Sequence, residues 1–289
     1  MNKDLELYFD RKRSRLEKAL DYYLSAENSQ VFEAMRYAVL GSGKRFRPLL
    51  LLASGEHFGA PEELLLPYAC AVEFIHNYSL VHDDLPSIDN DDFRRGRPSC
   101  HKRFGEALAL LAGDGLLTMA FEILAAAPAP ANDHQLKARV SAEMAMAAGP
   151  RGMIAGQWLD INFSPETQDL AAYQELASRK TAGLIKVSAV SGARLAGAPE
   201  AAIQALETYG LYLGLAFQLR DDLQDLFQDQ SAGKVRRPNL ARVLGEATSR
   251  EFLETWLGRA KRALEEAGID SDVLTFFLKQ LQPAREGQP

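Results

Sequence analysis

Helical periodicity is the feature that most constrains the fold of this chain. Segments of roughly 15 to 25 residues, rich in Ala, Leu, Glu and Gln, follow one another, and apolar residues recur three and four positions apart, as at Leu16, Leu20 and Leu24. Glycine and proline groups separate these segments, and hardly any stretch shows the apolar-polar alternation of a strand. The pattern predicts an all-α bundle of roughly ten or more helices. Because no linker or repeat divides the sequence, we expect residues 1–289 to form a single domain.

Composition limits the kinds of partner this chain can have. Of the 289 residues, 47% are hydrophobic, which is enough for a large core. The 33 basic and 39 acidic residues give a net charge of −6, so the chain as a whole does not attract nucleic acid or an anionic membrane. Any anionic ligand must therefore be held by local cations. Cys70 and Cys100 lack the spacing of a zinc site or a disulfide framework.

The sequence also bears on where the protein resides. Residues 1–15 are charged and lack the apolar core of a signal peptide. The most apolar region, residues 107–131, is interrupted by two acidic residues and closed by prolines, which makes it a poor membrane span. We therefore expect a soluble cytoplasmic protein that does not insert into membranes.

Residues 81–95 concentrate charge next to an apolar segment. Five carboxylates and two guanidiniums follow residues 69–81, which we interpret as a buried helix. Pro86 predicts that this helix ends near Leu85. Asp83 and Asp84 would then lie at the negative end of the helix dipole, where carboxylates need a compensating cation. Oxygen ligands of this kind suit Mg²⁺, although a solvated acidic turn has the same composition.

A second acidic group makes the metal interpretation stronger. An apolar helix from Tyr209 to Leu219 leads into Asp221, Asp222 and Asp225. On a helix, residues four apart share one face, so the carboxylates of Asp221 and Asp225 would repel each other. A metal ion bridged to a phosphate explains this arrangement better than solubility does. Two acidic groups, each ending an apolar helix, predict a cavity lined from two sides by metal ligands.

Basic residues supply candidate anion ligands. Residues 43–48 contain three cations between a glycine and a proline, which suits an anion but also describes a surface patch. Arg94 and Arg95 follow the first acidic group, and a guanidinium can fork onto phosphate oxygens. His76 lies seven residues before Asp83, on about the same helical face. Alone it would be an ordinary core histidine; beside cations it becomes a candidate phosphate donor.

Three smaller groups complete the candidate site. Lys180 and Thr181 interrupt an Ala-rich helical run, where they could contact a phosphate and free a backbone carbonyl. Gln218 lies three residues before Asp221 on the same face. Gln157 and Asp160 also share a face. For Lys180 and for the last pair, an ordinary exposed or packed polar residue explains the sequence as well.

Together these motifs resemble the trans-isoprenyl diphosphate synthases (trans-prenyltransferases), most closely the bacterial short-chain farnesyl diphosphate synthases. The resemblance runs from about Ala34 to Leu240 and rests on GKRFRP (43–48), HNYSLVHDDLPSIDNDDFRRGRPSCH (76–101), AGDGLL (112–117), GMIAGQWLDI (152–161), KTAGLI (180–185) and FQLRDDLQD (217–225). It implies the isoprenoid-synthase fold, a helical bundle around a deep central cavity, usually as a homodimer. It also implies condensation of isopentenyl diphosphate with an allylic diphosphate.

The resemblance also implies a role for each candidate residue. Mg²⁺, about three ions per active site, would be held by Asp83, Asp84, Asp89, Asp221, Asp222 and Asp225. The allylic diphosphate would contact Arg94, Lys180 and Lys234. Thr181 and Gln218 would stabilise the carbocation. Isopentenyl diphosphate would contact Lys44, Arg47, His76 and Arg95. Proton loss to the departing pyrophosphate would end the reaction. No nucleophilic side chain is needed, in agreement with the lack of a Ser/His/Asp constellation.

Product length is predicted from the helix that precedes Asp83. At about 1.5 Å rise per residue, Tyr78 and Ser79 lie roughly 6–8 Å below it. A bulky Tyr78 would stop the growing chain, and with the two extra residues inside the first acidic motif it matches the bacterial farnesyl pattern. We therefore expect a C15 product, with a geranyl or geranylgeranyl diphosphate synthase as the alternatives.

The chain departs from the family after the second acidic motif. Relatives carry a longer loop there, whereas here only residues 227–238 remain, with Arg236 and Arg237 in place of Thr and Tyr. This departure leaves a non-catalytic or regulatory subunit as an alternative, although such a subunit would be expected to lose one acidic motif. A terpene cyclase would use a different second metal motif and would have no purpose for the cations of residues 43–48.

Overall fold

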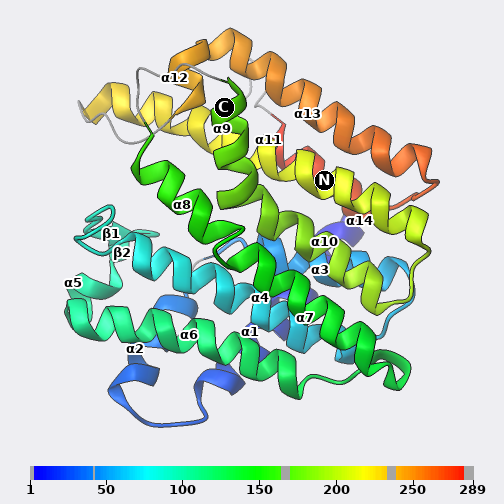
Figure 1. The fold of residues 1–289 in the computed structure, drawn as a ribbon, viewed down its shortest axis with the longest axis horizontal. Helices are drawn as coiled ribbons and strands as arrows, with labels where there is room; N and C mark the ends of the chain where they lie inside the picture. Colours follow the sequence, from blue (N-terminus) through cyan, green and yellow to red (C-terminus); the bar gives the residue numbers. More distant parts are fainter. Residues whose placement is uncertain (1–2, 42, 164–169, 233–238, 283–289) are drawn as a thin grey trace. The chain divides into compact units, whose positions relative to one another are not determined.

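A computed structural model describes residues 3–41, 43–163, 170–232 and 239–282, and for 227–232 the backbone only. The elements in chain order are α1 (Lys3–Leu24), α2 (Gln30–Val39), α3 (Phe46–His57), α4 (Glu62–Asp83), β1 (Phe93–Arg94), β2 (Arg97–Pro98), α5 (Cys100–Phe104), α6 (Glu106–Ala126), η1 (Pro130–Asn132), α7 (His134–Ala148), α8 (Met153–Ile161), α9 (Leu170–Ala177), η2 (Ser178–Ala182), α10 (Gly183–Leu195), α11 (Glu200–Ala232), α12 (Leu240–Leu244), α13 (Glu246–Glu266) and α14 (Asp272–Leu281) (Figure 1). The all-α prediction is confirmed. In the described part of the chain, the only sheet is the antiparallel hairpin β1–β2.

The chain divides into two compact units, residues 1–141 and 142–289, with the boundary inside α7. Apart from the small hairpin of the first unit, the regular secondary structure described in each unit is helical. The single-domain interpretation of residues 1–289 stays a prediction.

The first unit is built on α4, which is apolar on nearly every side and therefore buried. Tyr68 and Phe74 on this helix have no exposed surface. α6 packs along α4 at Gly113, where an added Cβ would lie 2.1 Å from Nε2 of His82. The His82 ring nitrogen also lies 3.1 Å from the carbonyl oxygen of Leu110. The AGDGLL motif therefore has a packing role: Gly113 lets two helices approach at an imidazole.

The second unit is built on α11, a helix of 33 residues that contacts α10, α13 and η2. An added Cβ at Gly214 of α11 would lie 2.4 Å from the Cα of Ala182, and one at Gly156 of α8 would lie 2.3 Å from the backbone nitrogen of Lys180. Both approaches require glycine. They place η2, a π-helical turn, closely against two helices, and such turns are frequent at functional sites.

The structure treats the two acidic motifs differently. α4 ends at Asp83 with Asp84 as its C-cap, which confirms the helix end predicted from Pro86. The prediction that the second motif also ends a helix is wrong, because α11 continues past Asp225 to Ala232. Neither glycine nor proline interrupts the sequence between Asp225 and Gly233, so nothing local stops the helix there.

Among the described residues, two helices, α4 and α6, are long and apolar enough to cross a membrane by length and composition alone. The apolar window of α4 is 67% buried inside the protein, as expected for a core helix, and that of α6 is 39% buried.

Candidate active site

The first acidic motif folds back on the end of α4. The backbone nitrogen of Asp89 donates to the carbonyl oxygen of Asp83 at 2.9 Å, and a turn at residues 85–88 closes the intervening loop. Asp83 and Asp89 are half-buried, whereas Asp84 is only 2% exposed. The backbone thus brings the first and last aspartates of the motif together and turns the middle one inward.

Asp84 is paired with Arg94. Nε of Arg94 lies 3.0 Å from Oδ1 of Asp84, Nη2 donates to the same oxygen, and Nη2 also lies 3.4 Å from Asp91. Burial raises the pKa of Asp84, and the guanidinium opposes that rise. The sequence predicted that Asp84 binds a metal and that Arg94 binds a diphosphate. In this structure the two side chains form an ion pair with each other.

The hairpin that carries Arg94 and Arg95 is anchored to α2. Arg95 and Gly96 form its two-residue turn with φ values of 54° and 75°, the conformation that suits a twisted two-residue hairpin. The guanidinium of Arg97 stacks 4.0 Å from the ring centroid of Tyr37, whose hydroxyl donates to the carbonyl oxygen of Pro98 at 2.7 Å. These contacts fix the hairpin and its two arginines relative to α2.

The predicted ligands of isopentenyl diphosphate gather in the first unit. Arg47 is buried in the first turn of α3, Lys44 is exposed just before that helix, and His76 is half-buried on α4. The pKa of His76 is lowered well below its ordinary value, first by burial and then by Arg47 and Arg95. Because both arginines lower the pKa of His76, we refer to Arg47, His76 and Arg95 as the basic cluster.

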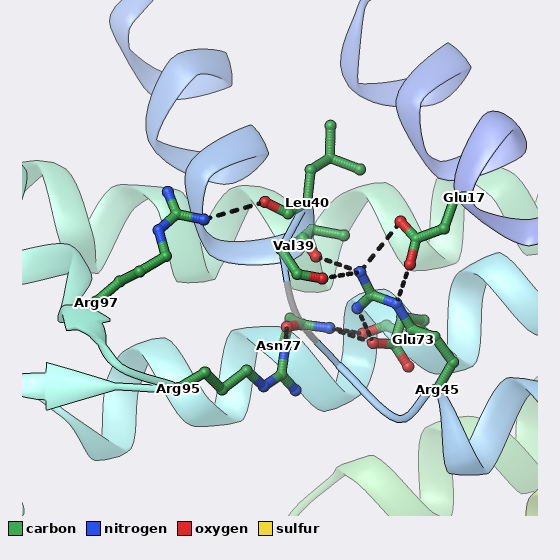
Figure 2. Close-up of polar contacts among 9 residues, drawn as sticks. Glu17, Val39, Leu40, Arg45, Glu73, Asn77, Arg95 and Arg97 are labelled. Atoms are coloured by element: carbon green, nitrogen blue, oxygen red, sulfur yellow. Dashed lines mark hydrogen bonds and ion pairs between the residues drawn. The ribbon is translucent and has the colours of Figure 1, made fainter. Parts of the chain in front are cut away.

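Arg45, the middle cation of GKRFRP, has a different role. Its side chain has no exposed surface and donates to Glu17 at 2.6 Å and to Glu73 at 2.5 Å (Figure 2). A buried guanidinium needs partners of this kind. The basic segment therefore combines one structural arginine with Lys44 and Arg47, a distinction that its sequence does not reveal.

In the second unit, η2 holds both residues of the Lys-Thr pair. Nζ of Lys180 lies 2.5 Å from Oδ2 of Asp160 on α8. The hydroxyl of buried Thr181 donates to Oε1 of Gln218 on α11 at 2.6 Å. The structure therefore joins Lys180 to the GQWLD motif and Thr181 to the FQLRDD motif, and Gln157 lies on α8, half-buried, one turn before Asp160.

Asp222 is the centre of this network and is 3% exposed. Its carboxylate accepts from the hydroxyl of Tyr173 at 2.5 Å, from Nε2 of Gln218 at 3.0 Å and from the backbone nitrogen of Leu240 at 2.8 Å. Burial raises its pKa to about 6, and these three donors oppose the rise. Nδ2 of Asn239 also donates to the carbonyl oxygen of Asp222, so this residue ties α11 to α9 and α12.

Asp221 and Asp225 differ from Asp222 in exposure: the first is half-buried and the second exposed. In both acidic motifs, then, the second aspartate is buried among protein donors and the first is partly open to solvent. Lys234 lies outside the described residues.

The donor chemistry fits Mg²⁺. Asp83 and Asp89 in one unit, and Asp221 and Asp225 in the other, are carboxylates with solvent-accessible surface. No group of three His, Cys, Asp or Glu side chains at metal-binding distance occurs among the residues that the structure describes. Mg²⁺ typically takes one or two carboxylates and completes its shell with water and phosphate oxygens, so such a cluster is not required.

The predicted product-length residues lie on the same turn of α4. Tyr78 is 6% exposed, and its ring meets that of His82 edge-on, with 5.8 Å between centroids. Burial, with a smaller contribution from the charge of Asp83, raises the pKa of Tyr78 to about 12. The hydroxyl of Ser79 donates back to the carbonyl oxygen of His76 at 2.9 Å, so Tyr78 supplies the bulk at this level.

A helical chain that carries two aspartate-rich motifs, a lysine-threonine turn and a separate basic cluster is a prenyltransferase in architecture. The family model for polyprenyl synthetases matches residues 28–237, and the chain belongs to that family.

Individual relatives agree with this assignment. The chain is 37% identical to a farnesyl diphosphate synthase of Geobacillus stearothermophilus over 98% of both chains. It is 40% identical to a chloroplastic geranylgeranyl pyrophosphate synthase of Catharanthus roseus over 91% of this chain and 76% of that protein. Among solved structures, a geranyltransferase from Legionella pneumophila superposes with a TM-score of 0.87 at 32% identity, covering 97% of both chains.

Three polar residues of these networks carry no signal in the sequence. Tyr173 and Asn239 are separated from Asp222 by 49 and 17 positions, and Asn77 is separated from Arg95 by 18. Their partners come from elements distant in the chain, so no local spacing identifies them.

Proposed function

We propose that this protein condenses isopentenyl diphosphate with dimethylallyl or geranyl diphosphate and releases farnesyl diphosphate, a C15 product. The reaction proceeds by ionisation of the allylic substrate, attack by the double bond and loss of a proton. Membership of the polyprenyl synthetase family and the 37% identical farnesyl diphosphate synthase support this class of reaction.

The observation that carries the proposal is the charge around His76. Burial lowers the pKa of His76 most, and the charges of Arg47, Arg95, Arg45 and Arg94 lower it further. Positive potential concentrated on a half-buried imidazole calls for an anion. This basic cluster lies beside the first acidic motif and adds cations that can bind a second diphosphate, as a two-substrate reaction requires.

Mg²⁺ would be held by Asp83 and Asp89 and by Asp221 and Asp225, and when bound it supplies charge neutralisation for a leaving diphosphate. Asp84 and Asp222 are also family candidates for this role. The hydrogen bonds that these two carboxylates make support an orienting role: Asp84 orients Arg94, and Asp222 orients Gln218.

Polar side chains of this protein bind the two diphosphates and stabilise the allylic cation. Lys180, held by Asp160, adds positive charge for the allylic diphosphate. The Thr181 hydroxyl and the Gln218 amide, linked to each other, present oxygen atoms that stabilise an allylic cation. Lys44, Arg47, His76 and Arg95 hold isopentenyl diphosphate; the departing pyrophosphate takes the proton, so no side-chain base is assigned.

A geranylgeranyl diphosphate synthase is the second candidate, because a plant enzyme of that name is 40% identical to this chain. The buried ring of Tyr78, about one and a half turns below Asp83, favours the shorter product. Cytoplasmic localisation is part of the same proposal.

We also propose a homodimer. Leu110 and Leu111 on α6 are 46% and 53% exposed, and adjacent exposed leucines on one helix favour a protein interface. Light scattering should then give about twice the chain mass of 31.9 kDa.

The decisive experiment is incubation of the purified protein with isopentenyl diphosphate, Mg²⁺ and each allylic diphosphate in turn, followed by sizing of the dephosphorylated products. A C15 alcohol from the dimethylallyl and geranyl starters is expected. A C10 or C20 product would replace the assigned length. The absence of condensation with every starter would refute the enzymatic proposal and favour the regulatory-subunit alternative.

A further inference from the structure

Arg95 is the most exposed of the three side chains in the basic cluster, since Arg47 is buried and His76 is half-buried. It is exposed and lies in the two-residue turn of the hairpin with a φ of 54°. A long charged side chain in such a place loses rotamer entropy when it binds an anion, and this cost weakens binding unless the side chain is already oriented.

A buried amide on α4 faces this guanidinium. Asn77 is 1% exposed, and its Oδ1 lies 3.5 Å from Nη1 of Arg95. Its Nδ2 donates to the carbonyl oxygen of Glu73 at 2.8 Å and to Oε1 of Glu73 at 2.9 Å. Because both of these atoms only accept hydrogen bonds, the amide nitrogen must point at Glu73 and the amide oxygen at Arg95.

Glu73 in turn is held by the buried Arg45. The Arg45 guanidinium reaches Glu73 at 2.5 Å, Glu17 at 2.6 Å and the carbonyl oxygen of Val39 at 2.7 Å. Figure 2 shows these side chains in sequence, from Glu17 through Arg45, Glu73 and Asn77 to Arg95. The orientation of Asn77 is therefore set by a network with no exposed member between Arg45 and the amide.

The backbone at Gly43 limits Arg95 from another direction. An added Cβ there would lie 3.1 Å from Nη1 of Arg95 and 3.2 Å from Nη1 of Arg45. Asn77 and Arg95 also line one hollow, together with Asp84 and Arg94. The contact between the Asn77 amide and the Arg95 guanidinium is direct, at 3.5 Å.

We propose that Asn77 is a positioning residue that orients Arg95 toward the diphosphate of isopentenyl diphosphate. This inference rests on the function proposed above. Asn77 does not touch substrate; it acts through Arg95. Its loss should therefore weaken binding of isopentenyl diphosphate and leave the allylic substrate unaffected.

The test uses two variants and a matched control. Asn77→Ala removes the amide. Asn77→Ser should fold readily, because a helical serine donates to the carbonyl four residues earlier, but it cannot reach Arg95. Glu17→Gln removes one charge beside Arg45 but leaves the contacts of Arg45 with Glu73 and Val39, which hold Asn77 in place. Thermal unfolding of each variant reports folding independently of substrate.

Calorimetric titration with isopentenyl diphosphate alone should show about five- to tenfold weaker binding for both Asn77 variants, the size expected for one hydrogen bond to a charged group. The KM for isopentenyl diphosphate should rise in parallel, with that for the allylic diphosphate unchanged, and Glu17→Gln should bind normally. In an Arg95→Ala background, Asn77→Ser should have no further effect.

The inference is overturned by unchanged binding in the Asn77 variants, by an equal effect of Glu17→Gln, or by additive effects in the Arg95→Ala background. These outcomes are separate from failure of the proposed function, because the titration needs no turnover. A wild-type protein that binds isopentenyl diphosphate but forms no product refutes the function alone, whereas one that does not bind it refutes both.

Discussion

The hydroxyl of Tyr173 donates to the carboxylate of Asp222, from a helix 49 residues earlier in the chain. Tyr173 is 2% exposed, and burial, followed by the charge of Asp222, raises its pKa well above the ordinary value, so the phenol stays protonated and remains a donor. The second acidic motif is thereby attached to α9 as well as to α12.

Replacing Tyr173 by Phe should destabilise the protein by about 1.5–3 kcal/mol, because it removes a hydrogen bond to a buried carboxylate. Differential scanning calorimetry without Mg²⁺ measures this loss. Tyr209→Phe is the matched control: Tyr209 is fully buried but donates to a neutral carbonyl, that of Leu274, so its loss should cost only about 1 kcal/mol. Equal losses in the two variants would contradict a special role for the Asp222 contact.

Gly113→Ala should destabilise the first unit, since the new methyl would lie 2.1 Å from the His82 ring. Overpacking of this kind costs about 1–3 kcal/mol. Gly115→Ala on the same helix meets the sulfur of Met35 at 2.9 Å, the end of a flexible side chain, and should cost less. A larger drop in melting temperature for Gly113→Ala than for Gly115→Ala would show that the close approach of His82 is what requires glycine at position 113.

Lowering the pH should weaken the fold through His76. Its pKa in the folded protein lies below the unfolded value of about 6.5, so below that pH the unfolded chain binds more protons and stability falls. His76→Gln lacks this proton uptake. The melting temperature of the wild type should therefore drop more steeply than that of His76→Gln between about pH 7.5 and pH 5.5. Parallel curves would show that His76 is not held neutral by burial and by its arginine neighbours.

Tyr78→Ala should lengthen the product beyond C15, because it removes the bulky ring that we propose as the stop about one and a half turns below Asp83. Tyr78→Phe keeps the bulk and loses only the hydroxyl, and it should still release a C15 product. Chromatography of the extracted products separates the two outcomes. Unchanged product length in Tyr78→Ala would show that another residue sets the limit.

Asp83→Asn should lower kcat by about 10²–10³, the loss seen when one transition-state electrostatic contact is removed. Asp92→Asn, in the same acidic stretch, should change kcat little, since Asp92 is exposed and pairs with Lys102 at 2.9 Å. Chelation of Mg²⁺ should abolish turnover in the wild type, and added Mg²⁺ should restore it. Equal losses in the two variants would indicate a general charge effect and no specific ligand role for Asp83.

Much of this protein could be predicted from local sequence. Helical periodicity and glycine or proline groups depend on neighbouring residues, so the all-α class and the end of α4 before Pro86 were accessible without a structure. The end of the helix that carries the second acidic motif could not be predicted in this way. No glycine or proline marks it near Asp225, and α11 continues to Ala232.

The motifs also identified the residue types that a diphosphate and a metal require, because spacing along a helix decides which side chains share a face. Only tertiary packing could decide which of these similar residues serve structure. Arg45 and Arg47 are two positions apart, yet Arg45 alone forks onto Glu17 and Glu73. Asp84 and Asp222 are buried among donors while Asp83 and Asp221 keep solvent access. The physical reason is desolvation: a buried charge must find partners, and most of those partners come from other elements of the fold.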